Sequence, residues 1–122
     1  MTKNKSTVNK LRNVIVEGIE DVKGEDIIIM DLQDIETAVC DYFIICTGTS
    51  NTHVNAIAGS VRRKTKEDLK ENPWNIEGED NGEWVLMDYV DIVVHVFQKH
   101  TREYYDLESL WGDAEILSAE NN

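Results

Sequence analysis

The first stretch of the chain places apolar side chains at the spacing of an amphipathic helix. Residues three and four apart share one helix face, so the pattern predicts a helix that packs through that face. Ser6 or Thr7 is suited to cap its N-terminus, and Gly24 is expected to end it. The apolar stripe consists of Leu11, Val14, Ile15, Gly18, Ile19 and Val22.

A second helix is predicted over residues 54–69, where one stripe is apolar and the opposite face is charged. Ser50 or Asn51 is a favourable N-cap, because its side-chain oxygen can accept a free backbone N–H. The Asn72-Pro73 pair is expected to stop the helix, since a residue before proline disfavours the helical conformation. The apolar stripe consists of Val54, Ile57, Ala58, Val61, Thr65 and Leu69. The charged face consists of Arg62, Arg63, Lys64, Lys66, Glu67 and Lys70.

Four short apolar runs, several of them rich in β-branched residues, predict strands over 27–32, 42–47, 83–89 and 91–98. The polar connection at 34–37 is short, which favours an antiparallel arrangement of the first two strands. The last two strands are close enough in sequence to form a hairpin. One further short strand is optional in the polar segment before that hairpin.

A last helix is predicted to begin at Thr101 as its cap. Tyr104, Leu107 and Trp111 fall at i, i+3 and i+7, so this stripe is expected to dock on the sheet. The order of elements is then α-β-β-α-(β)-β-β-α. It indicates an α/β fold of the α+β kind, in which helices pack against one mixed sheet.

The chain has 122 residues, of which 41% are hydrophobic, and this indicates a single folded domain over 1–122. We expect order over about residues 8–113, with short flexible ends. No apolar run approaches the roughly 20 residues of a membrane span, so no membrane partner is expected. Cys40 and Cys46 are too few for a disulfide framework and are expected to pack as small hydrophobes. With no secretory signal at the start of the sequence, these features indicate a cytoplasmic protein.

The formal net charge of −12 is unevenly distributed. Residues 1–71 hold ten basic and twelve acidic side chains, whereas residues 72–122 hold two basic and twelve acidic ones. Such an acidic chain is a poor match for phosphates, so nucleic acid is not expected as its main contact. The acidic second half either keeps the protein dispersed in solution or recognises a basic partner.

The sequence Thr-Gly-Thr-Ser-Asn, which begins at residue 47, joins a predicted strand to a predicted helix. Free backbone N–H groups at such a junction can hold an anion. The segment lacks the Lys-Ser/Thr pair of a Walker A loop and is not a G-x-G-x-x-G motif. A tight turn followed by an N-cap is the simpler interpretation, because these are common turn residues.

Asp88 and Asp91 lie between two predicted strands, where paired carboxylates could hold Mg²⁺. Residues three apart point to opposite faces of a regular strand, so a bulge or turn would be needed to bring them together. With the Gly48-Thr49-Ser50 turn, these carboxylates keep open an alternative function: a nucleotide-binding enzyme or nucleotidyltransferase.

The three histidines, His53, His95 and His100, lack the i, i+4 pairing of a helical metal site. His95 alternates with apolar neighbours, so it either faces away from the core or is a buried, hydrogen-bonded imidazole. We therefore expect no catalytic residue, no metal site and no cofactor.

Alternation along 83–89 puts Trp84, Leu86 and Asp88 on one face of the strand. The other face holds Val85, Met87 and Tyr89. Large apolar side chains ringed by carboxylates are typical of protein interfaces, although Trp84 could equally be a core residue.

Four blocks of the sequence follow one another with short gaps from residue 41 onward. They are DYFIICTGTSNTHVNAIA at 41–58, EG at 77–78, WVLMDYVDIVVHVF at 84–97 and REYYDLESLW at 102–111. In these blocks the chain resembles the ribosome silencing factor family, also called Iojap. The likeness covers nearly the whole chain, from about residue 11 to residue 111.

The resemblance implies a degenerate nucleotidyltransferase-like fold without enzyme activity. It implies a ribosome silencing factor that binds the large ribosomal subunit through the fourteenth protein of that subunit. The bound factor would sterically block small-subunit joining and so repress translation under nutrient limitation. The contact surface that the resemblance implies consists of Trp84, Met87, Asp88, Tyr89 and Asp91. Pairing of free sheet edges could also give a homodimer.

Overall fold

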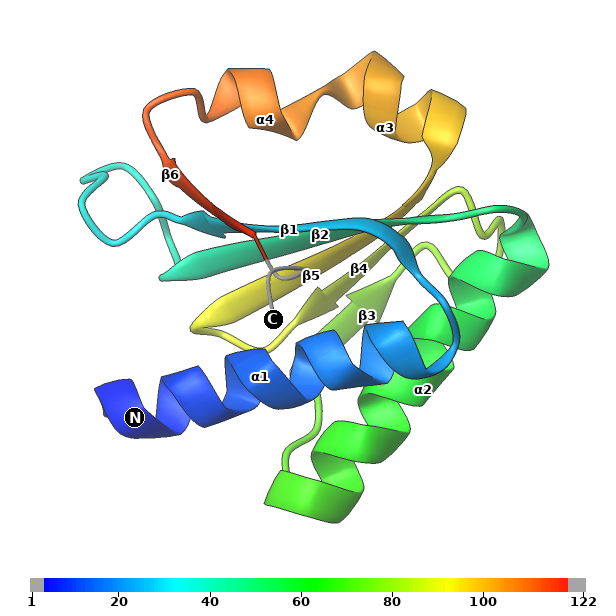
Figure 1. Cartoon of the computed structure of the whole chain (residues 1–122), viewed down its shortest axis with the longest axis horizontal. Coiled ribbons are helices and arrows are strands. Elements are labelled where there is room, and N and C mark those ends of the chain that lie inside the picture. Colours follow the sequence, from blue (N-terminus) through cyan, green and yellow to red (C-terminus); the bar gives the residue numbers. More distant parts are fainter. Residues whose placement is uncertain (1–3, 119–122) are drawn as a thin grey trace.

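The computed structural model describes residues 4–118 and places helices on both sides of one sheet (Figure 1). In chain order the elements are α1 (Lys5–Asp21), β1 (Glu25–Asp31), β2 (Tyr42–Gly48), α2 (Asn51–Leu69), β3 (Asn75–Glu77), β4 (Trp84–Asp88), β5 (Ile92–Gln98), α3 (Lys99–Tyr105), α4 (Leu107–Leu110) and β6 (Glu115–Ser118). Among the described helices, none is long and apolar enough to cross a membrane.

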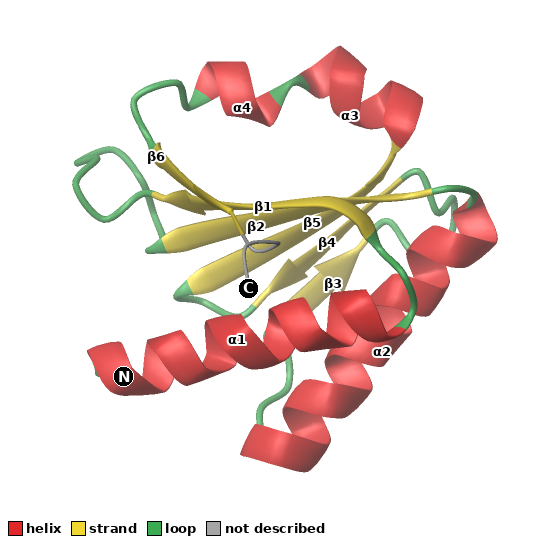
Figure 2. Cartoon of the chain, in the orientation of Figure 1, coloured by secondary structure: helices red, strands yellow, loops and turns green. Residues whose placement is uncertain are grey.

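The sheet is mixed, as the sequence predicts, with strand order β3-β4-β5-β2-β1-β6 (Figure 2). The two central strands, β2 and β5, are parallel, and all the other neighbouring strands are antiparallel. The antiparallel β1–β2 pair and the β4–β5 hairpin are therefore confirmed. Both central strands are buried along nearly their whole length, which explains their almost continuous apolar sequence.

The ends of the chain differ from the sequence prediction. β6 pairs with β1, and α1 begins at Lys5, so regular structure extends on both sides of the expected range 8–113. The flexible ends that the sequence predicts fall partly outside the described residues, at 1–3 and 119–122.

The two long helices cover one face of the sheet, here called the α1/α2 face, and cross each other closely (Figure 1). Gly18 of α1 makes the approach feasible, because a Cβ there would lie 2.9 Å from the Cα of Val61. The Ser60 hydroxyl donates a 2.7 Å hydrogen bond to the Gly18 carbonyl. Apolar side chains of both helices fill the space above the sheet, and those with no exposed surface include Leu11, Ile15, Ile19, Ile57 and Val61.

The cap predicted for α1 is wrong by two to three residues. Asn4 caps the helix, because its side-chain oxygen accepts the Thr7 backbone N–H at 2.8 Å. At the other end, Lys23 takes the left-handed conformation (φ 63°) just beyond the helix. Gly24 is needed there for space, since a Cβ at this position would lie 2.2 Å from a methyl carbon of Ile19.

For α2, Ser50 is confirmed as the N-cap, accepting the His53 backbone N–H at 3.0 Å. The helix ends at Leu69, and its last carbonyls accept the N–H of Lys70, which is left-handed (φ 59°). The helix therefore ends four residues before Pro73, and the expected role of the Asn72-Pro73 pair is wrong.

The last predicted helix is in fact two short ones, α3 and α4, on the other face of the sheet, here called the α3/α4 face. Asp106 separates them in a left-handed conformation (φ 49°) and caps α4. Thr101 lies inside α3 and is not its cap. Of the predicted stripe, Leu107 and Trp111 pack on the sheet, but Tyr104 points to solvent and is 82% exposed.

Candidate functional site

The α3/α4 face of the sheet carries a group of aromatic side chains from β2, β4 and β5. Strand register puts Trp84 opposite Phe97 and Leu86 opposite His95. The Trp84 ring lies 4.8 Å from the ring of Phe97 and 4.7 Å from that of Tyr105. Trp84 is half-buried, so part of its indole remains at the surface. This face therefore combines a packed interior with an accessible aromatic edge.

His95 is the polar residue at the centre of this aromatic group. Its Nδ1 atom accepts the indole N–H of Trp84 at 3.1 Å, and the Phe43 ring meets it edge to face at 4.6 Å. Burial lowers the pKa of His95 to about 4, so the imidazole is neutral near pH 7. Since Nδ1 accepts, the ring proton lies on Nε2, which is buried. His95 is thus a buried imidazole that orients Trp84.

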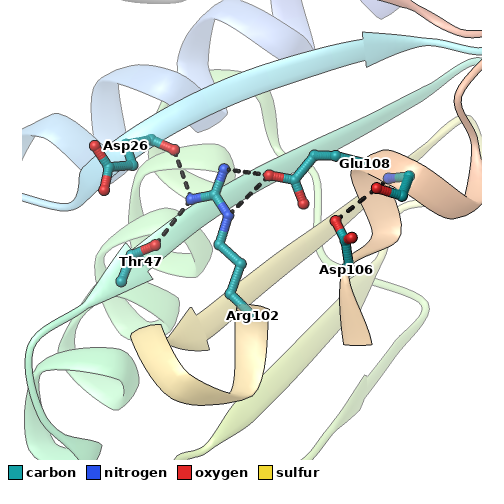
Figure 3. Close-up of polar contacts among 6 residues, drawn as sticks. Asp26, Thr47, Arg102, Asp106 and Glu108 are labelled. Carbon is teal, nitrogen blue, oxygen red and sulfur yellow. Dashed lines mark hydrogen bonds and ion pairs between the residues drawn. The ribbon is translucent and has the colours of Figure 1, made fainter. Parts of the chain in front are cut away.

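Arg102 of α3 fastens the short helices to the sheet (Figure 3). Its guanidinium donates to the Asp26 carbonyl at 2.7 Å and to the Thr47 hydroxyl at 2.8 Å. It also donates two hydrogen bonds to one carboxylate oxygen of Glu108 in α4, at 3.2 and 3.0 Å. One side chain therefore holds the start of β1, the end of β2, and both α3 and α4.

Large apolar side chains point to solvent along α3, α4 and β6. Tyr104 is 82% exposed, Leu110 is 71% exposed, and Tyr105 and Ile116 are each 49% exposed. Exposed carboxylates alternate with them, namely those of Glu103, Asp106, Asp113 and Glu115. We call this region, together with Trp84, the docking surface. Apolar anchors inside an acidic rim suit a basic protein partner.

The structure divides the five residues that the resemblance assigns to a contact surface. Trp84 and Asp88 are half-buried on the α3/α4 face. Met87 is fully buried on the α1/α2 face, and Tyr89 is 2% exposed, with its hydroxyl 2.9 Å from that of Thr65. Asp91 is 6% exposed. Met87, Tyr89 and Asp91 therefore lie below the surface, because the alternation along β4 and the turn after it bury them.

The turn and the two carboxylates of the alternative enzyme site lie at opposite ends of the sheet. Gly48 pairs with Gln98, whereas Asp88 is level with Val93 and Phe43. Five strand residues separate these levels, or roughly 16 Å. The fold therefore does not bring the Gly48-Thr49-Ser50 turn next to Asp88 and Asp91.

Local structure accounts for the polar groups at both ends. The Thr49 backbone N–H donates to His53 at 2.8 Å, and Ser50 caps α2. The Asp88 carboxylate accepts the Val90 N–H at 2.8 Å and so shapes the tight turn between β4 and β5. Within residues 4–118, no group of three or more His, Cys, Asp or Glu side chains is placed to hold a metal ion.

Both cysteines pack as the sequence predicts. Cys46 is fully buried beneath the helices, and Cys40 is half-buried on the other face; both are free thiols. Burial raises the pKa of each thiol to about 12, so neither is a thiolate near neutral pH.

Sequence reasoning missed most of the docking surface. The block at 102–111 contains Tyr105 and Leu110, but helical spacing gave no sign that the helix breaks at Asp106 and that both residues are exposed. The sequence did contain one signal of an exposed apolar surface, because Leu110 is apolar but lies off the predicted stripe.

Comparison with known proteins supports a single family. The sequence model described as "Ribosomal silencing factor during starvation" matches residues 5–122. The "Ribosomal silencing factor RsfS" of Bacillus subtilis is 46% identical over 100 residues, covering 80% of each chain. A mouse protein named "Mitochondrial assembly of ribosomal large subunit protein 1" is 31% identical over 101 residues, covering 81% of this chain and 44% of its own.

The fold is shared as well. A crystal structure of a Chromobacterium violaceum protein superposes with a TM-score of 0.80 at 42% identity, covering 86% of each chain. This likeness confirms the mixed sheet with helices packed on it, while the relation to nucleotidyltransferases stays a prediction.

Proposed function

The chain belongs to the family of ribosomal silencing factors, and from that membership we propose that it binds the large ribosomal subunit and keeps the small subunit from joining. The proposed result is repression of translation when nutrients are scarce. The name of the mouse relative, which refers to the large ribosomal subunit, supports the choice of subunit. Joining of subunits is a cytoplasmic step in bacteria, so the proposal places the protein in the cytoplasm.

The proposed partner on that subunit is its fourteenth protein. The observation that carries the proposal is the docking surface, where Tyr104, Tyr105 and Leu110 are exposed on α3 and α4 and the half-buried Trp84 packs against Tyr105. Solvent exposure of several large apolar side chains in one region typically marks a protein interface. Ribosomal proteins are generally basic, and the acidic rim would steer such a partner into register.

Trp84 and Asp88 remain in the proposed contact, since both are partly accessible. Met87, Tyr89 and Asp91 contribute from beneath, by fixing the strand and its turn. An interface of about 1,200–2,000 Å² in total is sufficient for specific binding. The contact is with protein; RNA is not its main component, and no membrane takes part.

The proposed mechanism is steric, without a chemical step. The separation of Gly48 from Asp88 along the sheet supports this proposal, because the turn and the carboxylates do not meet. Calorimetry with nucleoside triphosphates and Mg²⁺ should accordingly give no binding heat. Saturable heat at micromolar concentrations would favour the enzyme alternative. A homodimer through the edge strands β3 or β6 stays a prediction that sedimentation equilibrium can test.

Subunit association tests the proposal. Purified small and large subunits are mixed at a Mg²⁺ concentration that permits joining, and light scattering follows the rise in particle mass. Preincubation of the large subunit with excess protein should suppress that rise from the start. When the small subunit is preincubated instead, the protein can bind the large subunit only once the two are mixed, so suppression should develop with a delay. Full association while the protein remains bound to the large subunit would contradict steric blocking.

A further inference from the structure

The charged face of α2 holds a concentration of positive charge that the docking surface does not use. Arg62, Arg63, Lys66 and Lys70 are all exposed, and we call them the basic stripe. With Gly59 and Glu67 they line a shallow hollow of about 600 Å³. Four cations thus face one carboxylate, in a chain whose net charge is −12.

Two other cations of the protein, Lys64 and Arg102, are held by its own carboxylates. Lys64, on the adjoining side of α2, lies 3.8 Å from Glu17, 3.5 Å from Asp21 and 4.0 Å from Asp68. Arg102 is bound to Glu108. The basic stripe therefore differs from these, because its cations gather around a hollow that is open to solvent. Such a local reversal of charge attracts an anionic ligand.

The stripe is presented on a rigid support. The opposite side of α2 is anchored by Ile57, Val61 and Thr65, each with no exposed surface. Arg62 and Lys70 are eight residues apart, which spans about 12 Å along the helix. A Cβ at Gly59 would meet no atom within 4 Å, so the hollow is unobstructed at that end.

An exposed aromatic residue follows the stripe. Trp74 is 81% exposed and lies four positions after Lys70, a span of at most about 14 Å. Its backbone N–H donates to the Asp88 carbonyl at 2.6 Å, which fixes this segment beside β4. Binding of single-stranded RNA typically uses two components. Cations contact the phosphates, and an adjacent aromatic ring stacks on a base.

We propose that the basic stripe and Trp74 bind RNA of the large ribosomal subunit, as a second contact in addition to the protein contact of the docking surface on the other side of the sheet. Arginine and lysine of the stripe contact phosphates, with Arg62 and Arg63 able to donate paired hydrogen bonds. RNA is favoured over an acidic protein segment because the exposed indole suits a base. The inference rests on the proposed function, since the RNA is that of the subunit to which the factor binds.

The salt dependence of binding to intact large subunits tests the proposal. Each phosphate contact contributes about 0.7 to 0.9 to the slope of log K against log salt concentration. We expect Arg63→Gln/Lys66→Gln to lower the magnitude of that slope by about 1.4 to 1.8. Lys10→Gln/Lys23→Gln changes the net charge equally at two exposed lysines outside the stripe, and should keep the wild-type slope. Circular dichroism checks that both variants are folded.

The outcomes separate this inference from the proposed function. Absence of wild-type binding to large subunits would overturn both proposals. Wild-type binding with the same slope in all three proteins would overturn the RNA contact alone. Trp74→Ala should weaken binding several-fold at an unchanged slope, because stacking releases no counterion; an unchanged affinity would remove Trp74 from the site.

Cross-linking identifies the ligand directly. Gly59→Cys carries a benzophenone maleimide into the hollow, while native Cys46 is buried and Cys40 is half-buried. The labelled protein is irradiated on intact large subunits, and the adduct is treated with nuclease or with protease. If the cross-linked ligand is RNA, nuclease should digest it and return the adduct to nearly the mass of the labelled protein; this result would support the proposal. An adduct with a ribosomal protein, or none, would overturn it.

Discussion

The two faces of the sheet are covered very differently. On the α1/α2 face, helices of 17 and 19 residues bury a cluster of twenty described residues, with four more partly buried around it. On the α3/α4 face, helices of seven and four residues cover an apolar cluster of five buried and eight partly buried described residues. Both faces belong to the same strands, so strand sequence alone does not determine how completely a face is covered.

This difference separates stability from recognition. Complete burial of aliphatic side chains stabilises the fold and puts those side chains out of reach of a partner. Incomplete cover leaves Trp84 and the exposed side chains of α3 and α4 available for binding. Changes to the buried side chains of the first face should therefore alter stability, and changes to the exposed side chains of the second should alter binding.

The largest effect is expected from a cavity on the α1/α2 face. Ile57→Ala removes a fully buried side chain between α2 and the sheet, and should lower the free energy of unfolding by about 2–5 kcal/mol. Urea denaturation measures the loss. Under conditions in which the variant is folded, its affinity for large subunits should be unchanged. A loss of affinity in the folded variant would contradict the assignment of stability to one face and binding to the other.

Acid should act on the other face through His95. The pKa of this imidazole is about 4 in the folded state and 6.5 as a free side chain, so between these values only the unfolded chain takes up the proton. Stability is therefore lost as pH falls from 6.5 to 4, by about 3 kcal/mol in all.

Denaturation of wild type and His95→Gln at several pH values isolates this effect from that of the carboxylates. As pH falls through this range, the wild type should lose more stability than His95→Gln does. Parallel curves would show that His95 is not buried as a neutral imidazole.

Removal of the Arg102 anchor should have a smaller and local effect. Arg102→Gln breaks the hydrogen bonds to Asp26, Thr47 and Glu108, each to a partner within 3.2 Å. We expect a loss of about 1.5–3 kcal/mol, concentrated in α3 and α4. Amide hydrogen exchange resolves the location. Lys99→Gln, an exposed neighbour, is the matched control and should leave exchange unchanged.

Periodicity predicted most of the framework because local sequence controls it. Both long helices, the four main strands and the pairing of β1 with β2 follow from apolar spacing and loop length. The break at Asp106 and the strand β6 could not be predicted in this way. Asp106 takes a left-handed conformation that depends on its cap to α4, and β6 depends on the free edge of β1.

The contact residues were predicted less well, for a related reason. A matched block identifies a segment but not its exposed face, and β4 buries every second residue of that block. Alternation already separated Met87 and Tyr89 from Trp84, so the strand pattern was the better guide. Trp84 itself is also structural, since its indole N–H holds His95. Its substitution would therefore disturb folding as well as binding.

Affinity of Leu110→Glu for large subunits tests most directly whether the docking surface binds the ribosome. Leu110 is 71% exposed, so the variant should fold as stably as the wild type. Asn13→Glu adds the same charge at an exposed position of α1, on the opposite face. In gradient co-sedimentation, Leu110→Glu should bind at least about tenfold more weakly, a loss of about 1.4 kcal/mol, while Asn13→Glu binds as the wild type does. Equal binding of all three proteins would contradict the account.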